Sequence, residues 1–325
     1  MKVLGISAGT KNGSNDAMCK EALMGAKEQG ADIEFINVWD LDLKHCTGCV
    51  ACVKSLMSGR GGKCVLKDDF DWLKGEMLDA DGIVFAGPIF ESGMAGIFHT
   101  IVDRFGPRTD RAMNIIGTQI AEESGGTPPD PRILKDKVIS FMAIGGSDWA
   151  TRAQCDAGML AMTPAWKVID NEVFMWSKCI VMEDDKVARA HEIGVNIANA
   201  AADIEKATYQ GDPGVCPHCH CREIYIADDA KKCICTLCGL EGEIAVANGK
   251  VTFTFDPADE HKAHDTVSGK FLHADDIKEN EGKLDEWRKS DEFKARKQKY
   301  FDFISSTRPD DKKNNPIDKI PGISE

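Results

Sequence analysis

The sequence predicts an α/β protein: a doubly wound, five-stranded parallel sheet, then a small metal-binding ribbon and a charged helical tail. Short apolar segments alternate with helical segments along residues 1–208, as in a parallel sheet with helices on both faces. Several of the apolar segments are continuous runs, which is typical of strands covered on both sides. Two pairs of closely spaced cysteines after residue 209 indicate the ribbon.

The order of elements follows from these patterns. Strands are expected at 2–9, 31–38, 82–88, 137–146 and 171–177, and helices at 16–29, 68–80, 93–105 and 185–207. Residues 106–135, which include "GGTPPDP", look like an insertion. We expect a main domain over 1–208, a ribbon module over 209–256 and a charged extension over 257–325. The ribbon should contain a hairpin at 242–255 with an Asn-Gly turn, and the extension a helix within 285–304 and a loose "RPDDKKNNP".

The totals exclude several classes of function. The net charge is −13, which argues against nucleic acid or an anionic membrane as a partner, because both favour a basic surface. The sequence has no run of about 18 apolar residues, so we expect no transmembrane helix. The strand-like start "MKVLGIS" leaves no room for a signal peptide, so we expect a cytoplasmic protein.

The first strand end predicts a phosphate site. "SAGTKNGSN" (7–15) leads into a helix, and a helix N-terminus at the carboxyl edge of a parallel sheet favours a phosphate. The segment lacks the dinucleotide pattern G-x-G-x-x-G, and an ordinary turn with a helix cap is the alternative. The candidate phosphate-binding residues are Ser7, Gly9, Lys11, Ser14 and Asn15.

Two more strand ends predict a site for a flat ring. "PIFESGM" follows the third strand, and "AIGGSDW" ends the fourth in two glycines, which let a ring approach the backbone closely. A phosphate at the first strand and a ring beside the third and fourth is the flavodoxin arrangement for FMN. Phe90 and Trp149 either contact the ring or pack internally. The candidate ring-binding residues are Pro88, Ile89, Phe90, Glu91, Ser92, Gly93, Met94, Gly145 and Gly146.

Residues 1–105 resemble the NADPH-dependent FMN reductase family, which has a flavodoxin-like fold, and within it the iron–sulfur flavoproteins of anaerobes. The resemblance rests on "GISAGTKNGSN", "CTGCVAC…GKCVLKDDF", "ADGIVFAGPIF" and "IVDRF", in that order. Two positions depart from it: Gly9-Thr10-Lys11 replaces the usual Gly-Ser-Pro-Arg, and Phe90 replaces a tyrosine. The resemblance implies FMN, a homodimer or homotetramer, and electron transfer, without naming a substrate.

Ten of the thirteen cysteines fall in two groups, which in a reducing compartment indicates metal or redox chemistry. In the loop at 45–65 the C-x2-C-x2-C spacing suits a 4Fe–4S cluster, with a fourth ligand from farther along the chain; zinc or no metal are the alternatives. The expected ligands are Cys46, Cys49, Cys52 and Cys64. Cys19, Cys155 and Cys179 are expected to be buried packing residues.

The second group has two C-x2-C pairs separated by fifteen residues, the spacing of a zinc ribbon; a rubredoxin-like iron site is the alternative. The expected ligands are Cys216, Cys219, Cys235 and Cys238. We expect this metal to staple a module too small to bury its own core. The spare ligands Cys221, Cys233, His218 and His220 are expected on the outside of the module.

Two functions compete. The first is an FMN-dependent oxidoreductase that passes electrons from NAD(P)H or ferredoxin through FMN and the cluster to a quinone, a nitro or enone compound, oxygen or peroxide. The second is an electron carrier or redox sensor that docks a protein partner. The first is favoured because the insertion and the tail would wall a pocket over the flavin. No catalytic residue is assigned: His99 is expected in the packed core, and His45 merely adjoins the cysteine loop.

Overall fold

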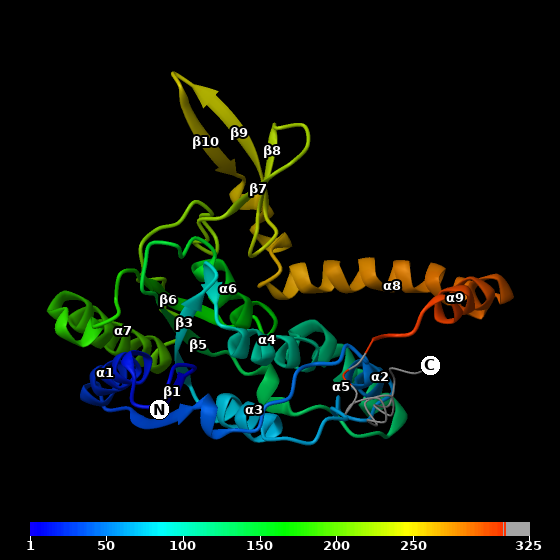
Figure 1. The fold of residues 1–325 in the computed structure, drawn as a ribbon, viewed down its shortest axis with the longest axis horizontal. Coiled ribbons are helices and arrows are strands. Elements are labelled where there is room, and N and C mark those ends of the chain that lie inside the picture. Colours follow the sequence, from blue (N-terminus) through cyan, green and yellow to red (C-terminus); the bar gives the residue numbers. More distant parts are fainter. Residues whose placement is uncertain (308, 310–325) are drawn as a thin grey trace.

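The computed structural model of the chain describes residues 1–307 and 309. Its main sheet is parallel, in the order β2-β1-β3-β5-β6, which is the flavodoxin order, and the predicted fold class is confirmed (Figure 1). A short strand, β4 (Gly93–Met94), pairs antiparallel with the end of β3. The parallel strands are β1 (Lys2–Ser7), β2 (Asp32–Asn37), β3 (Gly82–Phe90), β5 (Val138–Ile144) and β6 (Lys167–Phe174).

Helices cover both faces of this sheet and give it two cores. Ile83 and Phe85 of β3 pack on one face, whereas Val84 and Ala86 pack on the other, because successive strand side chains point to opposite sides. The first face is covered by α3 (Phe70–Asp79), α4 (Gly96–Thr109) and α6 (Ala153–Met162), and the second by α1 (Ser14–Glu28) and α7 (Asp184–Ala202).

The helix α6 and the structure of the insertion were not predicted. The segment "AQCDAGMLAM" shows no clear polar face, because Leu160 packs in the sheet core while a neighbouring face of the helix contacts the ribbon. Within residues 106–135, α4 continues through Pro107, and α5 (Arg111–Ser124) and a 3-10 turn at Pro131–Leu134 follow. The remaining short helices are Val38–Asp40, α2 (Ala51–Met57), Ile180–Met182 and Pro257–Lys262.

A four-stranded antiparallel sheet follows the main unit. Its order is β10-β9-β8-β7, and its strands are β7 (Ile224–Ile226), β8 (Lys232–Cys235), β9 (Glu241–Ala247) and β10 (Lys250–Phe255). The predicted hairpin joins β9 to β10, and both turn residues, Asn248 and Gly249, have positive φ as a type I′ turn requires.

Two helices end the described chain, α8 (Val267–Lys289) and α9 (Asp291–Phe303). The predicted helix at 285–304 is therefore interrupted at Ser290, whose hydroxyl accepts the Phe293 N–H and starts α9. The segment "RPDDKKNNP" lies outside the described residues except for Pro309. None of the described helices is long and apolar enough to cross a membrane.

Candidate flavin site and metal centres

The three segments predicted to bind a flavin lie side by side at one edge of the sheet. They follow β1, β3 and β5, which are adjacent, and parallel strands end at a common edge. The Ala8 N–H donates to the Ala86 carbonyl at 2.8 Å, and the backbone of Gly145 lies against the side chain of Ile89. The fold thus brings together residues that are more than 130 positions apart in sequence.

The loop after β1 presents an open helix N-terminus. Gly13, the N-cap of α1, supplies no side chain to the first-turn N–H groups. The buried Asp16 carboxylate fixes the loop by accepting the Asn12 N–H at 2.7 Å and the Asn37 amide at 2.8 Å. The Asn15 side-chain oxygen is buried without a partner among the described residues, which suits a ligand with hydroxyl donors such as a ribityl phosphate.

Other residues of this loop are arranged less directly for a phosphate. Ser7 is fully buried, and its hydroxyl accepts the Gly9 N–H at 3.3 Å. Lys11 lies on the surface and pairs with Asp40, so part of its charge is already neutralised. Ser14 is half-buried at the start of α1. The backbone of the helix terminus is therefore the main donor that this loop offers.

The segment after β3 forms a strained hairpin. Glu91 and Ser92 make its two-residue turn with φ values of 48° and 66°, a region that costs non-glycine residues free energy and is often found at functional sites. The first residues of α6 hold the turn in place. The Arg152 N–H donates to the Ser92 carbonyl at 3.0 Å, and the Asp156 carboxylate accepts the Met94 N–H at 3.1 Å.

Exposed apolar side chains surround this edge, and we call them the aromatic rim. The loop after β6 joins the edge through its backbone, since the Ser177 N–H donates to the Gly145 carbonyl at 2.8 Å. Phe90 and Trp176 are 66% and 65% exposed, so they are free to contact a ligand. The contribution of this loop was not predicted, although "FMWS" at a strand end was the available signal. The rim consists of Phe90, Trp149, Met175, Trp176 and Met182.

The prediction that His99 belongs to the core is wrong. Its side chain is partly exposed, and Nε2 lies 3.5 Å from a carboxylate oxygen of Asp156. The other candidate histidine, His45, is distant in sequence but contacts the same helix, because its Nδ1 is 2.8 Å from the Thr100 hydroxyl. Both imidazoles therefore gather at the first turn of α4, just after the strained hairpin.

The cysteine loop lies over two buried arginines of α4. Arg104 pairs with Asp68, donates to the Lys44 carbonyl at 3.1 Å and contacts the Cys64 sulfur at 3.8 Å. Arg108 donates to the Gly62 carbonyl at 3.4 Å. One nitrogen of each guanidinium and the Thr47 hydroxyl are buried without partners among the described residues. Three unsatisfied donors beside a thiol-rich loop suit thiolates and inorganic sulfide.

The four thiols of this loop differ in burial. Cys46 is exposed, whereas Cys49, Cys52 and Cys64 are half-buried, and Cys52 stands in the first turn of α2. Burial raises the pKa of the Cys52 thiol. Among the described residues, the compact sets of three or more ligand atoms do not include this loop.

The insertion packs against the cysteine loop. The Thr127 N–H donates to the Gly59 carbonyl at 2.8 Å, and Leu56 of α2 lies against Gly117 of α5. The expectation that residues 106–135 wall the flavin pocket is therefore not what these contacts indicate. They support the thiol loop instead.

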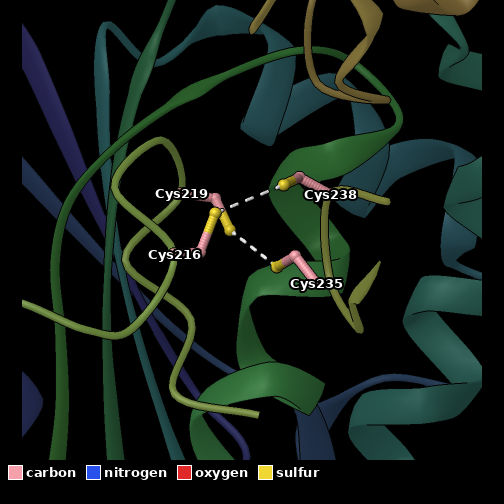
Figure 2. Close-up of side chains that lie close together, drawn as sticks. All are labelled: Cys216, Cys219, Cys235 and Cys238. Carbon is pink, nitrogen blue, oxygen red and sulfur yellow. Dashed lines mark hydrogen bonds between the residues drawn. The ribbon is translucent and has the colours of Figure 1, made fainter. Parts of the chain in front are cut away.

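The ribbon thiols form a compact four-sulfur group. Figure 2 shows the two C-x2-C pairs facing one another, and the four sulfur atoms all lie within 4.8 Å of each other. The Cys216 and Cys238 sulfurs are 3.7 Å apart, and those of Cys219 and Cys235 are 3.4 Å apart. Hydrogen bonds from the other three thiols hold the pKa of Cys216 well below its usual value. Three buried thiols and one half-buried thiol at these separations suit a tetrahedral Zn²⁺ or iron site.

The spare ligands of the ribbon differ from expectation. Cys221 and Cys233 are buried rather than outside, because they help to fill the small ribbon core. His218 lies 2.7 Å from the Asp265 carboxylate, and His220 stacks on Tyr209 with ring centroids 4.0 Å apart.

The three cysteines outside both groups differ in their exposure to solvent. Cys19 is buried as predicted, Cys155 is half-buried, and Cys179 is exposed, so the packing prediction is wrong for Cys179.

Comparisons with known proteins identify the family of this chain. A sequence model of NADPH-dependent FMN reductase matches residues 1–179. A solved structure titled flavone reductase is 61% identical, covers 95% of this chain and 100% of its own, and superposes with a TM-score of 0.84. A flavone synthase of Aspergillus candidus is 26% identical over 86% of this chain and 89% of its own. An iron–sulfur flavoprotein of Methanocaldococcus jannaschii is 33% identical over 39% of this chain, and the match spans 60% of that relative's length. This chain belongs to the NADPH-dependent FMN reductase family.

Proposed function

We propose that this FMN-dependent oxidoreductase reduces the conjugated carbon–carbon double bond of a flat aromatic enone of the flavone type, with NAD(P)H as donor. The observation that carries the proposal is the 61% identity to a flavone reductase over 95% of the chain. The flavone synthase similarity spans most of the chain as well, and its name concerns the same class of compound. The enone is one of the acceptors that the sequence predicts.

The reaction balances without a further reagent. NAD(P)H and one proton are consumed, the double bond gains a hydride at its β-carbon and a proton at its α-carbon, and NAD(P)⁺ and the saturated ketone are released. Bound FMN supplies the chemistry that accepts a hydride from the nicotinamide and returns it to the acceptor. The work left to the protein is to bind, to orient and to exclude water.

The residues of this chain divide that work. The N-terminus of α1 would hold the FMN phosphate with the loop residues Ser7, Gly9, Lys11, Ser14 and Asn15. The strained hairpin from Pro88 to Met94 and the glycines Gly145 and Gly146 would border the ring. The aromatic rim offers exposed apolar faces, on which a flat acceptor stacks favourably.

We further propose that Cys46, Cys49, Cys52 and Cys64 hold a 4Fe–4S cluster, and that Cys216, Cys219, Cys235 and Cys238 hold zinc. Arg104 and Arg108 support the first assignment because each keeps one buried N–H donor without a partner beside the thiols, while Asp68 and Asp71 balance their charges. The compact sulfur group supports the second. A cluster near the flavin would let the protein accept single electrons, so reduced ferredoxin is the alternative donor.

Anaerobic stopped-flow spectroscopy tests the proposal. Acid release should first give FMN rather than FAD, because the site has one phosphate loop and no dinucleotide motif. NADH, NADPH or reduced ferredoxin is then offered, and bleaching of the flavin is followed.

The reduced protein is next mixed with flavone, with its saturated analogue flavanone as the matched control, and with a quinone, a nitro compound and oxygen. We expect flavone to reoxidise the flavin and flavanone to leave it reduced. If only a quinone or a nitro compound reoxidises the flavin, that compound class, and not the enone, is the acceptor. Reoxidation by a protein partner alone would favour the electron carrier.

A further inference from the structure

The loop after β6 lays a lysine across one of the two glycines that are predicted to border the flavin ring. Lys178 lies in this loop, and its side chain runs over the backbone of Gly146. A Cβ built on Gly146 would lie 2.8 Å from Lys178 Cε and 3.2 Å from its Cγ, so the absence of a side chain lets the lysine stem pass this close. The ammonium follows Cε directly and therefore lies at Gly146.

Backbone hydrogen bonds fix this loop against the end of β5. The Gly145 N–H donates to the Phe174 carbonyl at 2.9 Å, and the Ser177 N–H donates back to the Gly145 carbonyl at 2.8 Å. Gly145 in turn lies against Ile89 at the end of β3. The sheet therefore sets the position of Lys178 relative to both segments that are predicted to border the ring.

Lys178 differs from other cations at this edge of the sheet. Its side chain is exposed, and the hydrogen bonds and ion pairs of the described residues give its ammonium no partner. An ammonium without a carboxylate partner keeps its full charge for a ligand. Other cations at this edge are paired with carboxylates: Lys11 with Asp40, Arg152 with Asp156, and Lys186 with Glu183.

The flavin ring changes its charge during the proposed reaction. NAD(P)H transfers a hydride, which is two electrons and one proton, so the neutral ring becomes singly negative and NAD(P)⁺ leaves. This charge arises in a chain of net charge −13, at an edge that also carries the exposed carboxylates of Glu91 and Asp148. A cation beside the ring stabilises the reduced form more than the oxidised form, and so raises the reduction potential.

We propose that the ammonium of Lys178 lies beside the ring of the bound flavin and raises its reduction potential by stabilising the negative charge of the reduced ring. Lys178 thereby favours hydride transfer from NAD(P)H to the flavin. This role rests on the FMN placement proposed above, and it does not depend on which acceptor reoxidises the flavin.

An anaerobic redox titration of the FMN-loaded protein against a reference dye tests this role. Lys178→Met removes the charge and keeps an unbranched stem over Gly146. We expect its potential to fall by about 30 mV, which is about a tenfold change in a two-electron equilibrium, while the affinity for oxidised FMN stays unchanged. Lys178→Arg should keep the wild-type potential, and Lys178→Glu should lower it further than Lys178→Met does.

Sulfite binding gives a second measurement that needs no reduction of the protein. The sulfur lone pair of sulfite forms a bond to the oxidised flavin ring, and the adduct leaves the ring negatively charged and bleached. Lys178→Met should bind sulfite about tenfold more weakly than the wild type. Lys250→Met, at an exposed lysine of the ribbon hairpin, makes the same charge change and should alter neither the potential nor the sulfite affinity.

The same potential in the wild type and in Lys178→Met would overturn the proposal. An equal loss of affinity for oxidised and reduced FMN would also overturn it, because the lysine would then serve only to pack on Gly146. If the potential shifts and flavone fails to reoxidise the flavin, the proposed acceptor is wrong and the role of Lys178 stands. If flavone reoxidises the flavin and the potential does not shift, this inference alone fails. A protein that binds no FMN refutes both.

Discussion

Gly93 shows how a single position fixes the geometry of the hairpin that we propose borders the flavin. A Cβ at this residue would lie 2.0 Å from the Asp156 carboxylate oxygen that accepts the Met94 N–H. Gly93→Ala must therefore displace either the hairpin or Asp156. We expect FMN to bind at least about tenfold more weakly and the protein to lose about 1–3 kcal/mol of stability, as overpacking usually costs. Fluorescence titration with FMN and urea unfolding measure the two effects.

Gly96→Ala is the matched control, because a Cβ there meets nothing within 4 Å. It should leave the FMN affinity unchanged and should not lower the stability, because alanine is a better helix former than glycine. Asp156→Ala in the Gly93→Ala background removes the clashing atom, so the two substitutions should not be additive. Unaltered FMN affinity in Gly93→Ala would mean that the hairpin does not border the ring.

At the scale of elements, the contact of α1 with α7 should depend on pH. His191 of α7 lies between two carboxylates of α1, 2.8 Å from Glu21 and 3.0 Å from Glu28. The hydrogen bond to Glu21, and then that to Glu28, raises the pKa of His191 above its usual value. A raised pKa stabilises the fold below the unfolded pKa of about 6.5, and this stabilisation is lost as the pH rises through the folded pKa. His191→Gln should therefore cost about 0.5–1 kcal/mol near pH 5.5 and little near pH 9.

Urea unfolding at the two pH values measures this difference. Glu21→Gln/Glu28→Gln keeps the imidazole and removes its partners, so it should abolish the same pH-dependent part of the stability. An equal loss in His191→Gln at both pH values would indicate packing instead of charge.

At the scale of the whole molecule, the ribbon is fastened to the main unit through α6. The Arg222 N–H donates to the Gln154 side chain at 3.2 Å, Cys155 lies 3.5 Å from the Thr236 hydroxyl, and Leu237 packs on Gly158. Arg152 and Asp156, at the start of α6, also hold the strained hairpin. A metal in the ribbon would therefore restrain, through α6, the hairpin that we propose borders the flavin.

Metal analysis of anaerobically purified protein should give about one zinc and about four irons per chain. Cys219→Ala should lose the zinc and keep the iron, whereas Cys49→Ala should lose the iron and the broad cluster absorption and keep the zinc. Cys179→Ala, an exposed thiol outside both groups, should change neither. Iron-free protein with a full complement of FMN would refute the cluster, and zinc retained in Cys219→Ala would refute the ribbon site.

The sequence by itself determined the features that local patterns encode. Apolar runs bounded by glycine and polar residues specified the central strands β3 and β5, because a strand covered on both faces is mainly apolar. The two C-x2-C pairs specified the four-sulfur group, and Asn248-Gly249 specified its hairpin, since both depend on spacing within one short segment.

Only the tertiary structure decided the features that depend on what covers a surface. The helix α6 is apolar on two sides because the sheet and the ribbon both pack on it, so its periodicity is hidden in the sequence. His99 is partly exposed, Trp176 is exposed and Cys221 is buried because of neighbours far away along the chain. The aromatic rim likewise exists only where β3, β5 and β6 end at one edge, since parallel pairing alone brings those three loops together.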